Sequence, residues 1–433
     1  MGKLSLVMRA LLPMLLLLCW PAAWAQIQAG PGAWSTNQTW ATDTVRAEAL
    51  TGYYYWPASA PALEGKRALV LVLHGCKQTA FDDVINVSGN GADKGFNWQA
   101  AADRYGAVIL APNATGNVYF SHCWDYATIG HQRGSGHDGV LLDLVNRFVG
   151  DPRYAIDPRQ VYVAGLSSGG GETMVLACLA PDIFAGAGID AGPPPGTTTF
   201  QIGFVPGGYT AARAGKNCKA LAGSHASSLS TQIASVVWGT ADLTVAPGYG
   251  PIDAAGMRSA YGGNFHQGAA VAVAGGGSNI PYTDGNGKLR TSEMTVSGMG
   301  HAWPAGSGGQ NTNFVDATHV DYPAFLMQFW FANNLRVSQV RAPALTSCGA
   351  TMSGSTVTVN GAATDAAGAV SSYHVTLEGP TLVDDGAAGS GAGFSKRYVL
   401  LASGTYAGVV KTTDSASGRT SATCYLQPMM VAR

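Results

Sequence analysis

The stretch VYVAGLSSGGG, residues 161–171, decides which fold this sequence is expected to adopt. Four residues of strand length lead into a G-x-S-x-G motif centred on Ser167, and a helical pattern follows over 172–180. A serine on a sharp strand-to-helix turn is exposed only where small residues flank it. Isolated matches to this motif arise by chance in glycine-rich chains. The strand-turn-helix context nevertheless predicts a nucleophile elbow with Ser167 as the nucleophile.

The region around this stretch alternates between strand and helix patterns. Segments with the length of strands occur at 67–73, 107–111, 161–164, 235–238 and 293–296, and the first of them is apolar throughout its last six residues. Segments with helical spacing lie between or after them, at 98–105, 139–149, 172–180 and 322–333. Such alternation predicts a doubly wound α/β sheet over about residues 66–335.

The character of the chain changes after about residue 340. Period-two alternation appears at 356–359 and 374–377, and no helical period follows. Short strands separated by turn residues predict a small, all-β, immunoglobulin-like sandwich. The predicted organisation is therefore a signal peptide at 1–25, an α/β catalytic domain at 26–338 and a β-sandwich module at 343–433.

The N-terminus and the cysteines predict export. Basic residues precede a short apolar run, Leu11–Trp20, and small residues around Ala25 suit cleavage after that position. The run is too short to span a membrane. Removal of Cys19 leaves an even number of cysteines, which in an exported protein favours disulfides. The predicted organisation favours pairing in sequence order: Cys76–Cys123, Cys178–Cys218 and Cys348–Cys424.

Charge and composition exclude several classes of partner. The 433 residues include 25 Lys and Arg against 26 Asp and Glu, and only 12% of all residues are charged. A charge-poor chain near neutrality is a weak electrostatic partner for nucleic acid or an anionic membrane. With 46% hydrophobic residues, the chain has enough apolar surface for a packed core. We therefore expect a secreted globular protein, extracellular or periplasmic, with neither nucleic acid nor membrane as partner.

Two further residues are expected to complete a catalytic triad with Ser167. A serine hydroxyl needs a base to take its proton and an acid to orient that base. Where a nucleophile elbow occurs, the partners follow in the order Ser, Asp or Glu, His. Asp242 comes just after one apolar run and His301 just after another, so they are the predicted acid and base. Asp190 and Asp253 are weaker alternatives for the acid.

The oxyanion hole requires two backbone N–H groups. One is expected from Ser168, directly after the nucleophile, and the other from Cys76, in the loop after the 67–73 run. His74 in that loop is predicted to shape it rather than to act as a base. No cofactor and no metal ion are predicted. His122, His131 and His137 occur near acidic residues, but their spacing matches no compelling ligand pattern.

The region from about 66 to 335 resembles the extracellular poly(3-hydroxybutyrate) depolymerase family of α/β-hydrolases, in the subgroup with a central lipase box. The matching segments are LHGCKQTA (73–80), FNWQAAADRYG (96–106), IDPRQVYVAGLSSGG (156–170), WGTADLTV (238–245) and GHAWPAG (300–306). The resemblance implies a serine hydrolase with Ser167 as nucleophile, Asp242 as acid, His301 as base and the Cys76 N–H in the oxyanion hole.

The resulting hypothesis is a secreted serine esterase that hydrolyses a polymeric or oligomeric ester of short hydroxyacids, such as poly(3-hydroxybutyrate). Trp124, Tyr126 and Trp303 are predicted to form an apolar substrate-binding surface. The alternatives are a feruloyl or acetyl esterase acting on plant polysaccharide, or a poly(aspartic acid) hydrolase. A secreted binding protein without catalysis is the alternative from a different class, and the complete Ser, Asp and His set argues against it.

Overall fold

The computed structural model describes residues 27–62, 66–86, 95–115, 122–337, 344–364, 370–414 and 424–431. The signal peptide predicted at 1–25 lies outside the described residues. The predicted boundary between the two folded domains, at 338–343, also lies outside them.

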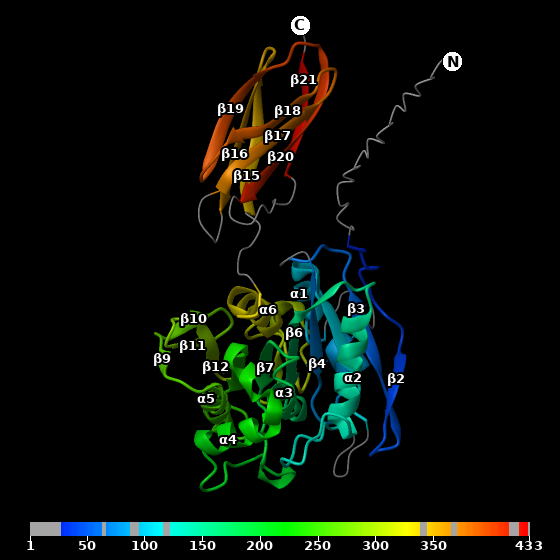
Figure 1. Ribbon diagram of the computed structural model, residues 1–433, viewed down its shortest axis with the longest axis vertical. Helices are drawn as coiled ribbons and strands as arrows, with labels where there is room; N and C mark the ends of the chain where they lie inside the picture. Colours follow the sequence, from blue (N-terminus) through cyan, green and yellow to red (C-terminus); the bar gives the residue numbers. More distant parts are fainter. Residues whose placement is uncertain are drawn as a thin grey trace, which may run out of the picture.

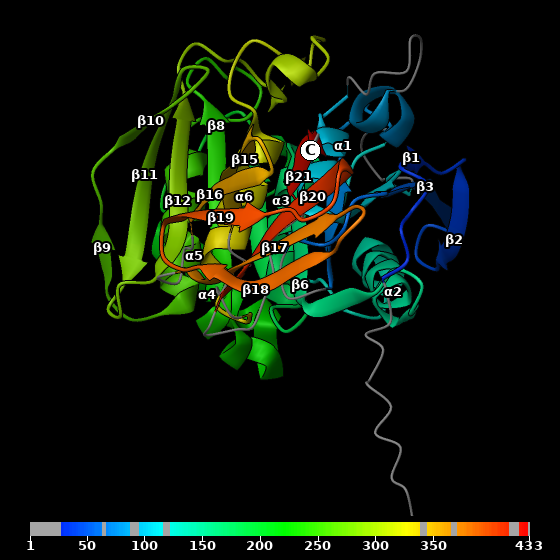
Figure 2. The same cartoon turned by 90° about the horizontal axis from the view of Figure 1, so that it is seen from above.

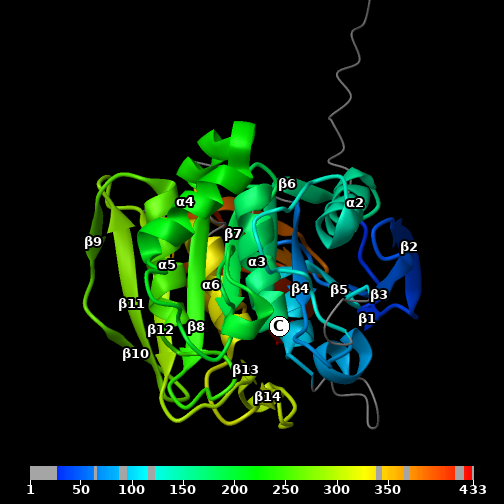
Figure 3. The ribbon, with the colours of Figure 1, turned by 90° about the horizontal axis from the view of Figure 1, so that it is seen from below.

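A large mixed sheet is the centre of the chain up to about residue 300 (Figures 1 and 3). Its strands are β1 (Ala33–Trp34), β2 (Gln38–Asp43), β3 (Glu48–Trp56), β4 (Arg67–Leu73), β5 (Val108–Pro112), β6 (Ile156–Leu166), β7 (Gly186–Asp190), β8 (Ile233–Gly239), β9 (Phe265–Gln267), β10 (Val271–Val273), β11 (Gly277–Asp284) and β12 (Leu289–Val296). The order across the sheet is β1-β3-β5-β4-β6-β7-β8-β12-β11-β10, with β2 on β3 and β9 on β11. From β5 through β4, β6, β7 and β8 to β12 the neighbours are parallel, and the two margins are antiparallel.

Helices cover both faces of this sheet, which explains why its central strands are apolar on both sides. The helices are α1 (Trp98–Tyr105), α2 (Gly136–Gly150), α3 (Ser168–Leu179), α4 (Ala211–Ala222), α5 (Tyr249–Tyr261) and α6 (Tyr322–Asn333). Side chains of α2, α3, α4 and α5 pack in one hydrophobic core, and those of α1 and α6 pack in the other. Alternate residues of β4 enter the two cores, with Leu69 and Leu71 in the first and Val70 and Val72 in the second. The predicted α/β architecture is therefore the observed one.

Shorter elements complete this part of the chain. They are the π-helical turn η1 (Ala80–Ile85), the 3₁₀ segments η2 (Thr199–Gln201), η3 (Gly223–Thr231) and η4 (Gly306–Gly308), and the paired strands β13 (Trp303–Pro304) and β14 (Val315–Asp316). Within the described residues, no helix is both long and apolar enough to cross a membrane.

The C-terminal strands form two antiparallel sheets (Figure 2). The strands are β15 (Ala344–Ser353), β16 (Thr356–Thr364), β17 (Val370–Glu378), β18 (Val383–Gly389), β19 (Gly393–Val399), β20 (Gly404–Asp414) and β21 (Cys424–Val431). One sheet has the order β15-β16-β19 and the other β18-β17-β20-β21. Their inward side chains form a hydrophobic core of their own, as expected of a β-sandwich.

The three disulfides follow the pairing that the sequence favours. Cys178–Cys218 joins α3 to α4, and Cys348–Cys424 joins β15 to β21. Cys76–Cys123 joins the loop after β4 to the segment that precedes α2.

Candidate active site

Ser167 occupies a strained turn between β6 and α3. Its backbone has φ 61° and ψ −119°, a conformation that costs a non-glycine residue on the order of 1–3 kcal/mol. The chain can pass so close to its neighbours only because glycines flank the serine. A Cβ on Gly165 would lie 2.5 Å from the Gly169 carbonyl oxygen, and one on Gly169 would lie 2.3 Å from the Leu73 carbonyl oxygen. The G-x-S-x-G motif therefore has a steric cause, and the turn holds the serine at the sheet edge.

Asp242 and His301 meet at the same edge of the sheet. Asp242 follows β8 and His301 follows β12, and these two strands are parallel neighbours. The His301 Nδ1 lies 2.7 Å from Asp242 Oδ2. The other oxygen of Asp242, Oδ1, accepts hydrogen bonds from the backbone N–H of Thr244 at 2.8 Å and of Val245 at 2.9 Å. With the carboxylate fixed in this way, Nδ1 carries the proton of the imidazole and Nε2 keeps its lone pair.

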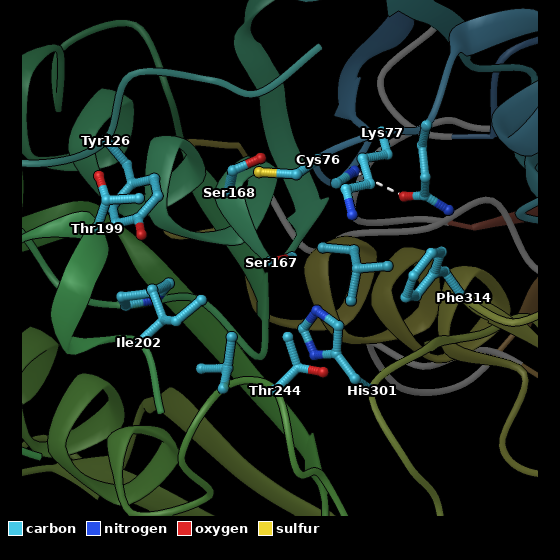
Figure 4. Close-up of a pocket in the computed structure, with 15 residues that line it drawn as sticks. Cys76, Lys77, Tyr126, Ser167, Ser168, Thr199, Ile202, Thr244, His301 and Phe314 are labelled. Carbon is cyan, nitrogen blue, oxygen red and sulfur yellow. Dashed lines mark hydrogen bonds between the residues drawn. The ribbon is translucent and has the colours of Figure 1, made fainter. Parts of the chain in front are cut away.

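Ser167 and His301 face one pocket, which has a volume of about 180 Å³ (Figure 4). The close-up shows the His301 ring below Ser167, with Thr244 beside it. Apolar side chains dominate the wall, and they are Tyr126, Leu166, Pro193, Ile202, Val245 and Phe314. Figure 4 shows Tyr126 and Ile202 to one side of Ser167 and Phe314 to the other. The pocket therefore combines a hydroxyl and an imidazole with an apolar lining.

The loop after β4 is held in shape by His74 and Gln78. The Nδ1–H of His74 donates to the Gly75 carbonyl at 2.7 Å, and its Nε2 accepts the backbone N–H of Ala114 at 3.1 Å. Burial lowers the pKa of His74 to about 4, so this side chain stays neutral and is no general base at neutral pH. The Gly75 N–H donates to Gln78 Oε1 at 2.7 Å.

Cys76 follows Gly75 and lines the pocket together with Ser168. Because the Gly75 N–H is already used by Gln78, the next N–H in this loop, that of Cys76, is the stronger candidate for the oxyanion hole. The disulfide to Cys123 braces this position. The oxyanion-hole role of the Cys76 and Ser168 N–H groups stays a prediction, and the position of both residues at the pocket is compatible with it.

Two of the three predicted substrate-binding aromatic residues belong to the core instead. Trp303 is fully buried, its ring stacks on Phe96 with centroids 4.8 Å apart, and its Nε1–H donates to the Phe96 carbonyl at 3.0 Å. Trp124 is buried between His74 and His137, with ring centroids 5.5 and 5.6 Å away. Neither lines the pocket, so the substrate-contact role predicted for them is wrong; Tyr126 does line the pocket.

Neither alternative acid contacts His301. Asp190 ends β7, and Asp253 lies in α5. Both are completely buried, and their carboxyl oxygens have no hydrogen-bond partner among the residues that the structure describes. Burial raises the pKa of Asp190, and the charge of Asp242 raises it further. Burial alone raises the pKa of Asp253. A protonated carboxyl group is a poor partner for an imidazolium, which favours Asp242 as the acid.

Several pocket residues were not anticipated. Phe314 comes from the loop before β14, and its ring lies 6.2 Å from that of His301. Ile202 follows η2, and Thr244 and Val245 follow Asp242 directly. Thr244 and Val245 lie within the WGTADLTV segment, so their position directly after the predicted acid could have identified them as pocket residues. Phe314 and Ile202 lie in irregular segments with no periodic pattern to mark them.

Residues 50–248 match the family model of esterase PHB depolymerase. A poly(3-hydroxybutyrate) depolymerase from Ralstonia pickettii is 69% identical over 71% of this chain and 63% of its own length. A poly(3-hydroxyalkanoate) depolymerase C from Paucimonas lemoignei is 29% identical over 58% of this chain and 57% of its own length. Among solved structures, an acetyl xylan esterase from Aspergillus awamori is 18% identical with a TM-score of 0.46, over 62% of this chain and 94% of that one. This chain thus spans less than two thirds of the two depolymerases that it resembles.

Proposed function

We propose that this chain, whose residues 50–248 match the esterase PHB depolymerase family model, is a secreted serine esterase that hydrolyses a polyester of short hydroxyacids such as poly(3-hydroxybutyrate). The observation that carries the proposal is the Asp242–His301 pair, which lies in reach of the pocket where Ser167 occupies a nucleophile elbow. The 69% identity to a poly(3-hydroxybutyrate) depolymerase supports the choice of substrate.

Acylation follows from the positions of these groups. The Ser167 Oγ attacks the ester carbonyl carbon while Nε2 of His301 accepts the hydroxyl proton. The carbonyl oxygen gains negative charge, which the N–H groups of Cys76 and Ser168 bind. Collapse of this intermediate breaks the ester C–O bond, and His301 returns the proton to the departing alcohol end of the chain. Asp242 stabilises the imidazolium throughout, because its Oδ2 lies against Nδ1.

Deacylation repeats these steps with water. His301 accepts a proton from the attacking water, the same N–H groups bind the second oxyanion, and Ser167 leaves as its hydroxyl on receiving the proton back. The products are a carboxylic acid end and an alcohol end. These two half-reactions need no other chemical group.

The size of the pocket and its surroundings support a polyester over a plant phenolic ester. A volume of about 180 Å³ is below the ~300–1,000 Å³ of pockets that hold drug-sized ligands, and it suits a short hydroxyacid unit. Large apolar side chains that neighbour the site residues in sequence are exposed. Leu243, next to Asp242, is 97% exposed. Phe200 and Phe204, two residues before and after Ile202, are 79% and 56% exposed. An exposed apolar surface of this kind suits contact with a water-insoluble chain.

Location outside the cytoplasm is part of the same proposal. The structure contains three disulfides, and such bonds persist in oxidising compartments. The signal peptide predicted for residues 1–25 would direct the chain there.

A substrate panel tests the proposal. The purified protein is incubated with poly(3-hydroxybutyrate) film, feruloylated xylan, acetylated xylan and poly(aspartic acid), and the released acid is measured against a Ser167→Ala control. We expect release from the polyester film to exceed that from each other substrate by at least about tenfold. Preferential release of ferulate or acetate would overturn the substrate, and equal release by the Ser167→Ala control would overturn the mechanism.

A further inference from the structure

Three buried side chains gather outside the catalytic pocket. His131 lies in the loop before α2, Asp138 in the first turn of α2, and Glu172 in α3. One possible ligand atom from each, a ring nitrogen and two carboxylate oxygens, lies within 4.8 Å of the others. None of the three residues lines the pocket that contains Ser167. This cluster, which we call the 131/138/172 cluster, is therefore separate from the proposed chemistry.

Several polar atoms of this cluster lack hydrogen-bond partners among the described residues. Glu172 is 0% exposed, and neither of its oxygens accepts a hydrogen bond from a donor among the described residues. The side chains of His131 and Asp138 are 6% and 7% exposed. Asp138 Oδ2 faces His131 Nδ1 at 3.1 Å and the Gln132 N–H at 3.3 Å, whereas Asp138 Oδ1 has no hydrogen-bond partner in the described chain. Burying so many unpaired polar atoms is costly unless something binds between them.

We propose that His131, Asp138 and Glu172 bind one divalent cation of the zinc class. Two carboxylates supply two negative charges, which a divalent ion balances, and one imidazole supplies a nitrogen ligand. Zinc accepts this mixture of nitrogen and oxygen ligands. Calcium and magnesium prefer all-oxygen sites, so they fit the histidine less well.

The distances suit an ion of this size. Bonds of about 2.0–2.2 Å to nitrogen and oxygen place neighbouring ligand atoms roughly 3–3.5 Å apart. The 3.1 Å between His131 Nδ1 and Asp138 Oδ2 already has this value. All three ligand atoms lie within 4.8 Å of one another, so a pair at that limit would have to approach by about 1.3–1.8 Å around the ion.

A proton is the competing occupant. Burial raises the pKa of Glu172, and the charge and hydrogen bonding of Asp138 raise it further, so a proton on Glu172 is the alternative to a bound cation. One proton satisfies one pair of oxygens only. A cation contacts all three side chains at once, which is why the cluster as a whole favours the ion.

The position of the cluster indicates a structural role. The segment between Cys123 and His131 carries Tyr126, which lines the catalytic pocket, and Cys123 is bonded to Cys76 of the expected oxyanion loop. Glu172 belongs to the helix that begins directly after Ser167. A bound ion would therefore link the segment that carries Tyr126 to α3, the helix that follows the nucleophile.

The test is metal binding by the intact, oxidised protein, and it needs no ester substrate. Protein treated with chelator and desalted is titrated with ZnCl₂, and bound zinc is measured by mass spectrometry together with the thermal unfolding temperature. We expect one zinc per chain and a rise of a few degrees in Tm, because a ligand that binds only the folded state stabilises it.

Matched variants locate the ion. Glu172→Gln keeps the shape of the side chain, and we expect it to lose both the bound zinc and the rise in Tm; His131→Gln provides the same readout should Glu172→Gln not fold. Asp253→Asn removes another completely buried carboxyl without a hydrogen-bond partner, outside the cluster, and should bind zinc as the wild type does. Two results would overturn the proposal: a wild-type protein that binds no zinc, or a zinc-dependent rise in Tm that is the same size in Glu172→Gln and in the wild type.

Discussion

The large α/β sheet and the C-terminal β sheets bury their strands in different ways. Every residue of β4 and of β8 is buried, because helices cover both faces of the large sheet. In β16 the burial alternates with period two, and in β19 half-buried residues alternate with exposed ones. Strands buried on both sides can present functional groups only at their ends, and the triad candidates stand at such ends.

The same contrast separates the chemistry of the two regions. Ser167, Asp242 and His301 all belong to the first region, and no member of the predicted triad lies beyond residue 301. We therefore propose that residues 344–431 form a module that the catalytic step does not need. The predictions that follow test this division of roles.

The largest effect is expected from removing the nucleophile. Ser167→Ala should lower kcat/KM for a soluble p-nitrophenyl ester by roughly 10³–10⁶-fold, as in other triads. The protein should still fold, because alanine is small enough for the same turn and the substitution neither adds nor removes a charge. Circular dichroism checks the fold alongside the kinetics. A folded Ser167→Ala protein with normal turnover would remove Ser167 from the mechanism.

The second prediction compares one disulfide from each region. Replacing Cys76 and Cys123 by serine should lower kcat on the soluble ester by about tenfold or more, since loss of one oxyanion donor costs roughly 10²–10³-fold in serine hydrolases. Replacing Cys348 and Cys424 should leave kcat unchanged and lower only the stability of the C-terminal module, by about 2–4 kcal/mol. Equal loss of kcat in both pairs would argue against the bracing role of Cys76–Cys123.

The third prediction concerns the pH dependence of stability in the large sheet. Burial raises the pKa of Asp253 in the folded state above its unfolded value. The stability linked to its protonated form is therefore fully present below about pH 3.9 and is lost as the pH rises through the folded pKa. Asp253→Asn should stabilise the protein relative to wild type at pH 8 and not at pH 4, as measured by urea unfolding. A difference that is constant between these two pH values would refute the buried-acid assignment.

The smallest effect is expected from removing the C-terminal module. A chain ending at Val337 should retain turnover of a soluble ester within about twofold, because every proposed catalytic group and the pocket precede that point. Adsorption to polyester film should also change little. Tyr373 and Tyr406 are buried in the module core, and Phe394 and Tyr398 are only half-exposed, so few aromatic side chains among those that the structure describes in this module are free to stack on a polymer. Loss of soluble-ester turnover would mean that the module completes the catalytic domain.

The features that could be predicted from the sequence are those that depend on hydrophobic periodicity and on the order of motifs along the chain. The apolar runs became buried strands, and because β8 and β12 are parallel neighbours, the residues just past their ends met as the Asp242–His301 pair. Helix α4 was not predicted because its apolar residues are mostly alanines, although those that face the core, Ala214, Cys218 and Leu221, recur at helical spacing. Trp303 was misassigned because closeness in sequence to His301 does not determine where its side chain points. The Trp303 ring, in β13, packs in the core. Phe314 reaches the pocket only through a long-range loop contact, which no local pattern encodes.

Labelling with an active-site-directed fluorophosphonate tests the central claim most directly. The intact protein is treated with the reagent, digested, and its modified residue is located by mass spectrometry while ester hydrolysis is followed in parallel. We predict one adduct per chain, on Ser167, with hydrolysis lost in proportion to labelling and no adduct in His301→Ala. Complete inhibition with the adduct on another serine, or full activity after stoichiometric labelling of Ser167, would contradict it.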